Sequence, residues 1–79
     1  MRRIEPKTIH RHFKGKYYLI EDIAQNTDTQ ELMVVYRELY GSNRLWVRTL
    51  SDFLETVDPD RKDNITGQSY RFVEVKSII

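Results

Sequence analysis

The chain contains no cysteine, and only two histidines, two prolines and three glycines occur among its 79 residues. Without cysteine, no disulfide can cross-link the fold, and two histidines are too few for a four-ligand structural zinc site. A chain of this length forms one domain, and its folding buries only about 60–65% of the unfolded surface. Side-chain packing or self-association must therefore hold the molecule together.

The sequence also lacks a long apolar segment. A helix that crosses a bilayer needs about 20 predominantly apolar residues, and no run approaches that length. The N-terminus, MRRIEPKTIH, includes no apolar stretch of the kind found in secretory signals. These features predict a cytoplasmic protein with no membrane partner.

The net charge is only +1, but it is unevenly placed along the chain. Residues 1–20 carry six basic side chains against one acidic side chain, and the remaining 59 residues carry seven basic against eleven acidic. A small total charge argues against a strongly electrostatic nucleic-acid binder. The basic N-terminal stretch could still contact phosphates, although short runs of like charge usually remain solvated.

Motifs that carry catalysis are missing as well. There is no cysteine nucleophile, no GxSxG elbow and no glycine-rich phosphate loop, and no spacing singles out a pair of carboxylates. His10 and His12 fall on one side of an extended segment, but two imidazoles without further ligands do not make a transition-metal site. The sequence therefore predicts no enzyme, no metal site and no cofactor.

Two runs rich in β-branched and aromatic side chains, residues 32–39 and 45–50, flank the turn formers Gly41, Ser42 and Asn43. This pattern is typical of a β-hairpin. Further strands are predicted at 17–24, 55–57 and 70–75, with polar loops at 25–30 and 58–69.

The pattern changes after Leu50, where Ser51 can cap a short helical turn with its hydroxyl. Asp52 and Glu55 add negative charge near the N-terminal end of this turn, where the helix dipole stabilises it. Several short strands without a helix of about ten residues indicate an all-β meander, and closing the sheet into a barrel removes its adhesive edges. The predicted fold is all-β, a small SH3-like barrel of about five short strands with one short helical turn.

Pro6 and the polar residues around it make residues 1–11 a poor helix or strand. We expect 1–11 to be a basic, flexible segment and 12–79 to be a single small β-barrel domain that starts near His12. The predicted core consists of Tyr18, Ile20, Ile23, Leu32, Val34, Tyr36, Leu45, Val47, Phe53, Leu54, Phe72 and Val75.

One hairpin register pairs Leu39 with Arg44 across a four-residue turn. It would place Arg37 opposite Trp46 on an outward face, with the apolar side chains on the other face, although a slip of one residue would change the pairing. Trp, Tyr and Arg combine rigid area with directed hydrogen-bond donors and dominate binding hot spots. The predicted binding site comprises Arg37, Tyr40, Trp46 and Arg48.

An arginine beside a tryptophan can also be a surface stacking pair without a ligand. The function that the residues favour is a non-catalytic binding or adaptor module for a protein or peptide partner. One alternative is a single-stranded nucleic-acid-binding module, since small barrels stack bases on aromatics beside cations. Another is a homo-oligomer in which Met33, Val35 and Trp46 form an interface between identical subunits.

Three ordered motifs suggest a known family: HFKGKYYLI at 12–20, VVYRELYG at 34–41 and LWVRTLSDFLETV at 45–57. In these motifs the chain resembles the domain of unknown function family 1653, a family of small bacterial proteins. The resemblance implies a small SH3-type β-barrel and adds no function. Thr49 departs from the family, which more usually has a proline after the arginine.

Overall fold

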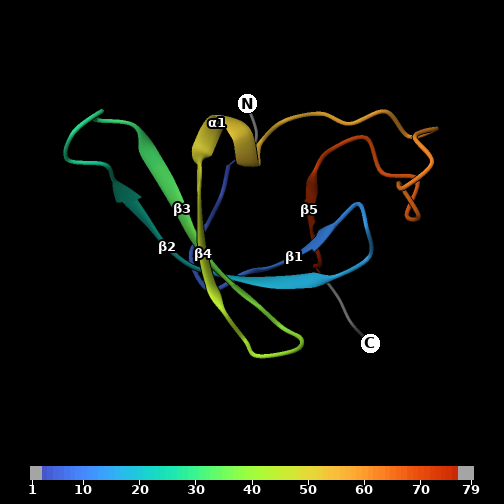
Figure 1. Cartoon of the computed structure of the whole chain (residues 1–79), viewed down its shortest axis with the longest axis horizontal. Helices are drawn as coiled ribbons and strands as arrows, with labels where there is room; N and C mark the ends of the chain where they lie inside the picture. Colours follow the sequence, from blue (N-terminus) through green and yellow to red (C-terminus); the bar gives the residue numbers. More distant parts are fainter. Residues whose placement is uncertain (1–2, 77–79) are drawn as a thin grey trace.

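Five antiparallel strands and one helical turn make up the computed structural model, which describes residues 3–76. Their bounds are β1 Ile9–His12, β2 Tyr17–Gln25, β3 Leu32–Glu38, β4 Leu45–Thr49, α1 Leu50–Phe53 and β5 Phe72–Glu74. The strands form a single curved sheet in the order β4-β3-β2-β1-β5 (Figure 1). The all-β class is confirmed, with the helical turn between the last two strands. Residues 1–2 and 77–79 of the two predicted segments lie outside the described residues.

Strand β1 extends the sheet upstream of the predicted domain start near His12. Within it, His10 pairs with Tyr18 of β2 and with Glu74 of β5, and only 2% of its surface is exposed. The sequence of β1, IHRH, does not alternate apolar and polar residues as a strand usually does, because its inward positions hold histidines instead of aliphatic residues. Residues 9–11, predicted as part of a flexible segment, therefore belong to the folded domain.

The core lies between the sheet and the helical turn. Phe53 of α1 stacks on Phe72 of β5 with ring centroids 4.0 Å apart, and Tyr36 meets both rings edge to face. A β-bulge after Ile20 explains how that residue and Ile23, three positions apart, both contribute to the core although a regular strand alternates its faces. Five of the predicted core residues are buried: Ile20, Val34, Tyr36, Phe53 and Phe72.

The hairpin forms as predicted, but its register differs by one residue. Tyr36, not Arg37, faces Trp46, because the turn spans residues 39–43 and the Glu38 amide donates to the Arg44 carbonyl at 3.0 Å. Asn43 adopts a positive φ of 55° and donates its side-chain amide to the Glu38 carbonyl, which holds the longer turn. As a result, Leu45 (50%) and Val47 (59%), predicted in the core, are about half exposed. Leu32, also predicted in the core, is 48% exposed as the first residue of β3.

The helical turn is capped by Thr49 and not by Ser51. The Thr49 hydroxyl accepts the Asp52 amide at 3.2 Å, and Asp52 lies in the first turn as predicted. We expect Thr49→Ala to lower the free energy of unfolding by about 1 kcal/mol, because an orphan amide loses its acceptor. Ser51→Ala should change it by no more than a few tenths, since Ser51 contacts only the Thr49 hydroxyl. Urea unfolding of both variants measures the difference, and equal losses would contradict this cap assignment.

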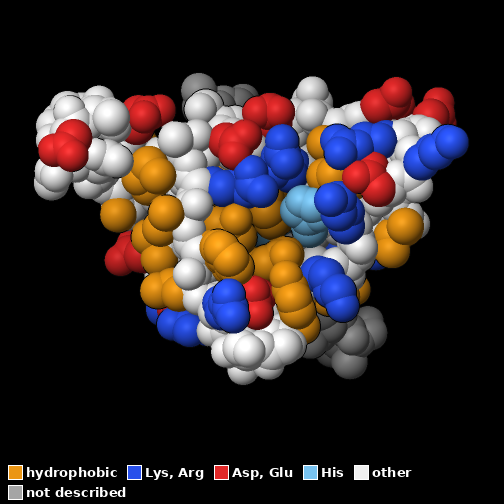
Figure 2. Space-filling view, in the orientation of Figure 1, with side chains coloured by type: hydrophobic (Ala, Val, Ile, Leu, Met, Phe, Trp, Pro, Cys, Tyr) orange, Lys and Arg blue, Asp and Glu red, His pale blue; other side chains and the backbone are white. Residues whose placement is uncertain are grey.

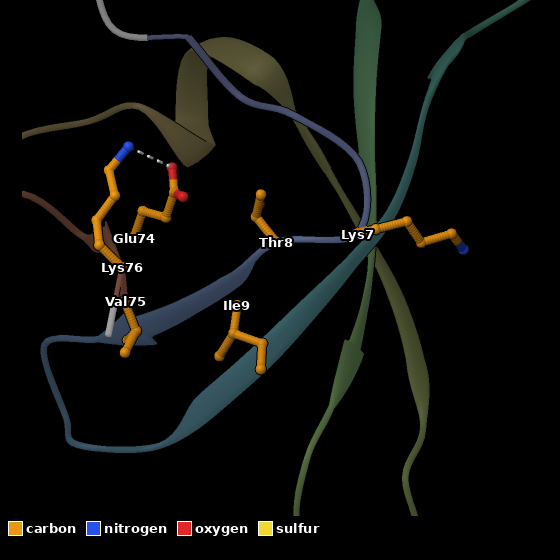
Figure 3. A pocket seen from close by; sticks show the side chains of 6 residues that line it. All are labelled: Lys7, Thr8, Ile9, Glu74, Val75 and Lys76. Atoms are coloured by element: carbon orange, nitrogen blue, oxygen red, sulfur yellow. Dashed lines mark ion pairs between the residues drawn. The ribbon is translucent and has the colours of Figure 1, made fainter. Parts of the chain in front are cut away.

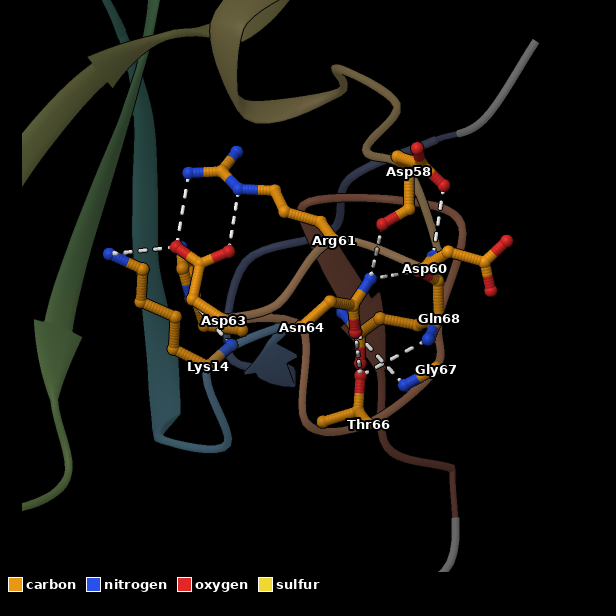
Figure 4. Close-up of polar contacts among 10 residues, drawn as sticks. Lys14, Asp58, Asp60, Arg61, Asp63, Asn64, Thr66, Gly67 and Gln68 are labelled. Carbon is orange, nitrogen blue, oxygen red and sulfur yellow. Dashed lines mark hydrogen bonds and ion pairs between the residues drawn. The ribbon is translucent and has the colours of Figure 1, made fainter.

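The polar loop 58–69 is ordered by tertiary contacts. Its Asn64 side chain donates to the carbonyls of Asp58 and Gln68 and accepts from the Gly67 amide (Figure 4). The Ile65 amide donates to the carbonyl of Phe13, which ties the loop to the buried Phe13 side chain beneath it. The strand predicted at 55–57 is reduced to one isolated bridge between Thr56 and Tyr70.

Candidate functional site

Four aromatic rings and one guanidinium line a hollow of about 240 Å³ on the inner side of the sheet. They come from β2, β3, the hairpin turn and β4: Tyr18, Tyr36, Tyr40, Trp46 and Arg48. In Figure 2, hydrophobic side chains gather in the middle of the face shown, among lysines and arginines and beside a histidine. Trp46 stays 45% exposed, so the hollow opens to solvent.

Hydrogen bonds hold the aromatic walls in place. The hydroxyls of Tyr18 and Tyr40 lie 2.7 Å apart, and the Trp46 indole N–H donates to Glu38 Oε1 at 2.8 Å. Tyr18 also meets Tyr36 and Tyr40 edge to face, with centroids 5.4 and 5.6 Å apart. Each polar atom of these rings has a hydrogen-bond partner, so the rings are already held in position before a ligand arrives. This reduces the conformational entropy that is lost on binding.

Arg48 forms the cationic end of the hollow. Its Nε donates to the Tyr36 hydroxyl at 3.0 Å, and its Nη1 pairs with the Asp52 carboxylate from the helical turn. The guanidinium also lies 5.9 Å from the centre of the Phe72 ring. A second cation, Lys16 Nζ, stands 5.0 Å over the Tyr40 ring. The hollow therefore combines flat apolar walls with positive charge at its rim.

Arg37 does not belong to this hollow, contrary to the prediction. The one-residue change in register turns it to the opposite face of β3, where its Nε pairs with Glu21 at 2.9 Å. Its Nη1 donates to the Asn43 carbonyl at 2.9 Å, so it braces the hairpin turn. The bond from Arg37 to Glu21, with a further bond from Lys7, holds the pKa of the Glu21 carboxyl below its usual value.

Two lining residues, Tyr18 and Tyr36, were predicted in the core and not in the site. Tyr36 is nearly buried, whereas Tyr18 is half-buried and presents its hydroxyl to Tyr40. Burial and the bond to Tyr40 raise the pKa of Tyr18 above its usual value, so the phenol stays neutral at physiological pH. The sequence signal for an inward-facing tyrosine was the pair at 17 and 18, since successive residues of a strand face opposite sides and only one of the two can point inward.

His12 lies next to the hollow and stays neutral. Its ring stacks on Phe13 at 4.3 Å and its Nδ1 accepts the Lys14 amide at 3.0 Å. Burial, followed by the positive charges of Arg48 and Arg71, lowers its pKa from 6.5 to about 4.

This shift predicts a pH-dependent stability. The unfolded chain binds a proton at His12 near pH 6.5 and the folded chain only near pH 4, so the His12 contribution is complete above 6.5 and is lost as the pH falls through this window. Urea unfolding at about pH 7.5, 5.5 and 4.5 should show a smaller pH dependence in His12→Gln than in the parent protein. An imidazole that titrates near its ordinary pKa by NMR would contradict the assignment.

A larger depression of about 340 Å³ lies between β1 and β5. Figure 3 shows its lining side chains, with Lys7 directed away from Glu74 and Lys76. Lys76 Nζ pairs with Glu74 at 3.6 Å and Lys7 Nζ with Glu21 at 3.1 Å, so its cations are already engaged. No aromatic ring lines it, and it is a weaker candidate than the aromatic hollow.

The described residues hold no group of three or more metal-ligating His, Cys, Asp or Glu side chains. Between residues 3 and 76, no helix is long and apolar enough to cross a membrane.

Comparisons with known proteins agree with the fold. The model of the family described as protein of unknown function (DUF1653) matches residues 8–74. A crystal structure of a protein of the same family from Bordetella bronchiseptica is 32% identical, with a TM-score of 0.75, over 96% of this chain and 92% of that one. No curated protein matches. The chain therefore belongs to the DUF1653 family, whose function is unknown.

Proposed function

We propose that this chain is a non-catalytic binding module that holds a segment of a protein or peptide partner in the aromatic hollow. The observation that carries the proposal is the convergence of three tyrosines, one tryptophan and one arginine on a single opening. These residue types dominate the energetics of protein interfaces because they bury large rigid area at little entropic cost. Trp46 is the only tryptophan of the chain and lies at the opening, 45% exposed.

The size and charge of the hollow favour a particular kind of segment. A volume of about 240 Å³ is smaller than the usual small-molecule site and accommodates about one large side chain. Flat aromatic walls suit an aromatic ring or a proline. Lys16 at the rim supplies a positive charge that suits a carboxylate, whereas Arg48 is already paired with Asp52. The proposed ligand is therefore an aromatic or proline side chain with an acidic neighbour.

The polar groups of the hollow support binding over catalysis. The Tyr18 phenol stays protonated and is bonded to Tyr40, and Arg48 is held by Tyr36 and Asp52. A catalytic nucleophile needs an adjacent base, and the hydroxyls of Tyr18 and Tyr40 bond each other instead. The groups are arranged to fix the walls and not to exchange protons.

An amide NMR titration tests the proposal with two capped peptide pools. Each peptide of the first pool carries one Trp, Phe or Pro flanked by glutamates, and the second pool replaces the glutamates with lysines. We expect shifts at the Trp46 indole and at Tyr40 with the acidic pool only. Trp46→Ala should weaken binding by a factor of about 10 to 100, the range of a hot-spot residue.

Arg37→Ala is the matched control, because Arg37 lies on the opposite face and is paired with Glu21. Binding unaffected by Trp46→Ala, or lost equally in Arg37→Ala, would overturn the proposal.

Single-stranded nucleic acid is a second candidate, favoured by the cations around His12. Arg48, Arg71, Lys14 and Arg61 all add positive potential there, beside the aromatic walls. However, acidic partners at Asp52, Glu55 and Asp63 offset these cations. Fluorescence anisotropy with oligo(dT) at low and moderate salt decides: affinity that falls steeply with salt supports this candidate, and no binding at low salt removes it.

A further inference from the structure

Strand β4 is an open edge of the sheet with few of the usual protective features. Among residues 3–76 it pairs with β3 alone, its register shows no bulge, and its sequence LWVRT contains neither lysine nor proline. Its one charged residue, Arg48, is paired with Asp52 on the inner face. Three consecutive apolar residues on it are half exposed: Leu45 (50%), Trp46 (45%) and Val47 (59%). Proteins normally blunt such an edge because its free amides and carbonyls template pairing with another strand.

The free backbone groups can be assigned along β4. Antiparallel ladders alternate hydrogen-bonded and non-hydrogen-bonded pairs, and the Glu38 amide bonds the Arg44 carbonyl. By that alternation, Trp46 and Arg48 direct their backbone groups toward β3. Leu45, Val47 and Thr49 direct theirs to the open side.

We propose that two copies of the chain pair through β4, antiparallel, about a two-fold axis at Val47. In this register Trp46 of each copy lies opposite Arg48 of the other on the inner face, which gives two cation–aromatic pairs. On the outer face Val47 meets Val47, and Leu45 meets Thr49. The interface is isologous and joins two five-stranded sheets so that the two aromatic hollows open on the same side.

Charge distinguishes this register from its neighbours. An axis at Trp46 would place Arg48 opposite Arg44, and an axis at Arg48 would place it opposite its own copy. Like charges directly opposite one another destabilise a strand pair. An axis at Leu45 would set Arg44 against Trp46, but β4 begins at Leu45, so most of the strand would lie opposite turn residues. The axis at Val47 sets each Arg48 against a Trp46 and keeps the whole of β4 paired, and for this reason a second copy suits the edge.

The cysteine-free sequence makes the register directly testable by single-cysteine variants of the full chain. Directly opposed residues have Cα atoms about 4.5–5.5 Å apart, within the range of a disulfide. Val47→Cys should therefore form a covalent dimer under mild oxidation. Leu45→Cys is the register control: the two copies of residue 45 would lie about 13 Å apart, too far to link. Ile65→Cys, on a 73% exposed residue of a distant loop, controls for random collision.

Sedimentation of the unmodified chain provides the second readout. A concentration-dependent dimer is expected, together with a blue shift of the single-tryptophan emission as Trp46 is covered. Val47→Lys should raise the dissociation constant roughly tenfold or more by placing charge at the edge, while Ile65→Lys should leave it unchanged. A monomer at all concentrations, or cross-linking of Leu45→Cys as fast as Val47→Cys, would overturn the proposal. Because Trp46 lines the hollow and also lies at this edge, peptide binding is measured on Val47→Lys, so that failure of one proposal is distinguishable from failure of the other.

Discussion

Replacing Phe53 with alanine is expected to lower the free energy of unfolding by about 3–5 kcal/mol. The Phe53 ring is fully buried, lies parallel to Phe72 at 4.0 Å and meets the rings of Tyr36 and His10 edge to face. Its removal loses the burial of the ring and leaves a cavity between α1 and the sheet. Since a domain of this size has a total stability of about 4–12 kcal/mol, this one change could unfold the protein.

The measurement is urea unfolding followed by circular dichroism. Leu32→Ala is the matched control, because Leu32 was predicted in the core but is 48% exposed, and it should cost much less than Phe53→Ala. Should Phe53→Ala fail to fold, Phe53→Leu keeps part of the volume and should lose less. Costs of similar size for Phe53→Ala and Leu32→Ala would contradict the burial described for these two residues.

Asn64→Ala is expected to have the second largest effect, about 2–3 kcal/mol, although residue 64 lies in a polar loop. The buried amide donates to the Asp58 carbonyl at 3.0 Å and the Gln68 carbonyl at 2.8 Å, and it accepts the Gly67 amide at 2.9 Å (Figure 4). Alanine would remove the hydrogen-bond partner that these three backbone groups share. Thr66→Ala removes two longer contacts of the same cluster, from its hydroxyl to Asn64 Oδ1 at 3.3 Å and from the Gln68 amide to its hydroxyl at 3.2 Å, and should cost less.

Asn64→Asp separates hydrogen bonding from packing, because the two side chains have nearly the same shape. A carboxylate in this position would face the carbonyls of Asp58 and Gln68, which need a hydrogen-bond donor that only the protonated acid supplies. The folded state then favours the protonated acid, so the variant should lose stability as the pH rises above the unfolded pKa of about 4. Unfolding at about pH 7 and pH 4 measures this, and a variant whose deficit is unchanged at low pH would contradict the network.

The local elements were predictable because their signals are local. The turn formers at 41–43 between two β-branched runs indicate a hairpin, and Asp52 beside capping hydroxyls indicates a helical turn. Both exist, with the cap at Thr49 in place of Ser51. Neighbouring residues determine whether a strand or a turn forms. Tertiary contacts then determine which of the nearby hydroxyls caps the helical turn.

The candidate site was predictable only in part. Tyr40, Trp46 and Arg48 line one hollow, whereas Arg37 lies on the opposite face with Glu21. A strand alternates its faces at every residue, so one extra residue in the hairpin turn was enough to separate Arg37 from the others. Tyr18 joins the site from β2, and nothing in its local sequence indicates that its hydroxyl meets Tyr40.

The sequence by itself determined the all-β class, the hairpin, the helical turn and the aromatic and basic residue types that build the hollow. Only the tertiary structure decided the register, the burial of His10 and Phe13, and the order of the loop around Asn64. The physical reason is that strand propensity and turn chemistry act between neighbours along the chain. Register and burial depend instead on which distant segments of the chain pack together. A loop of polar residues becomes ordered once its amides form hydrogen bonds within that packing.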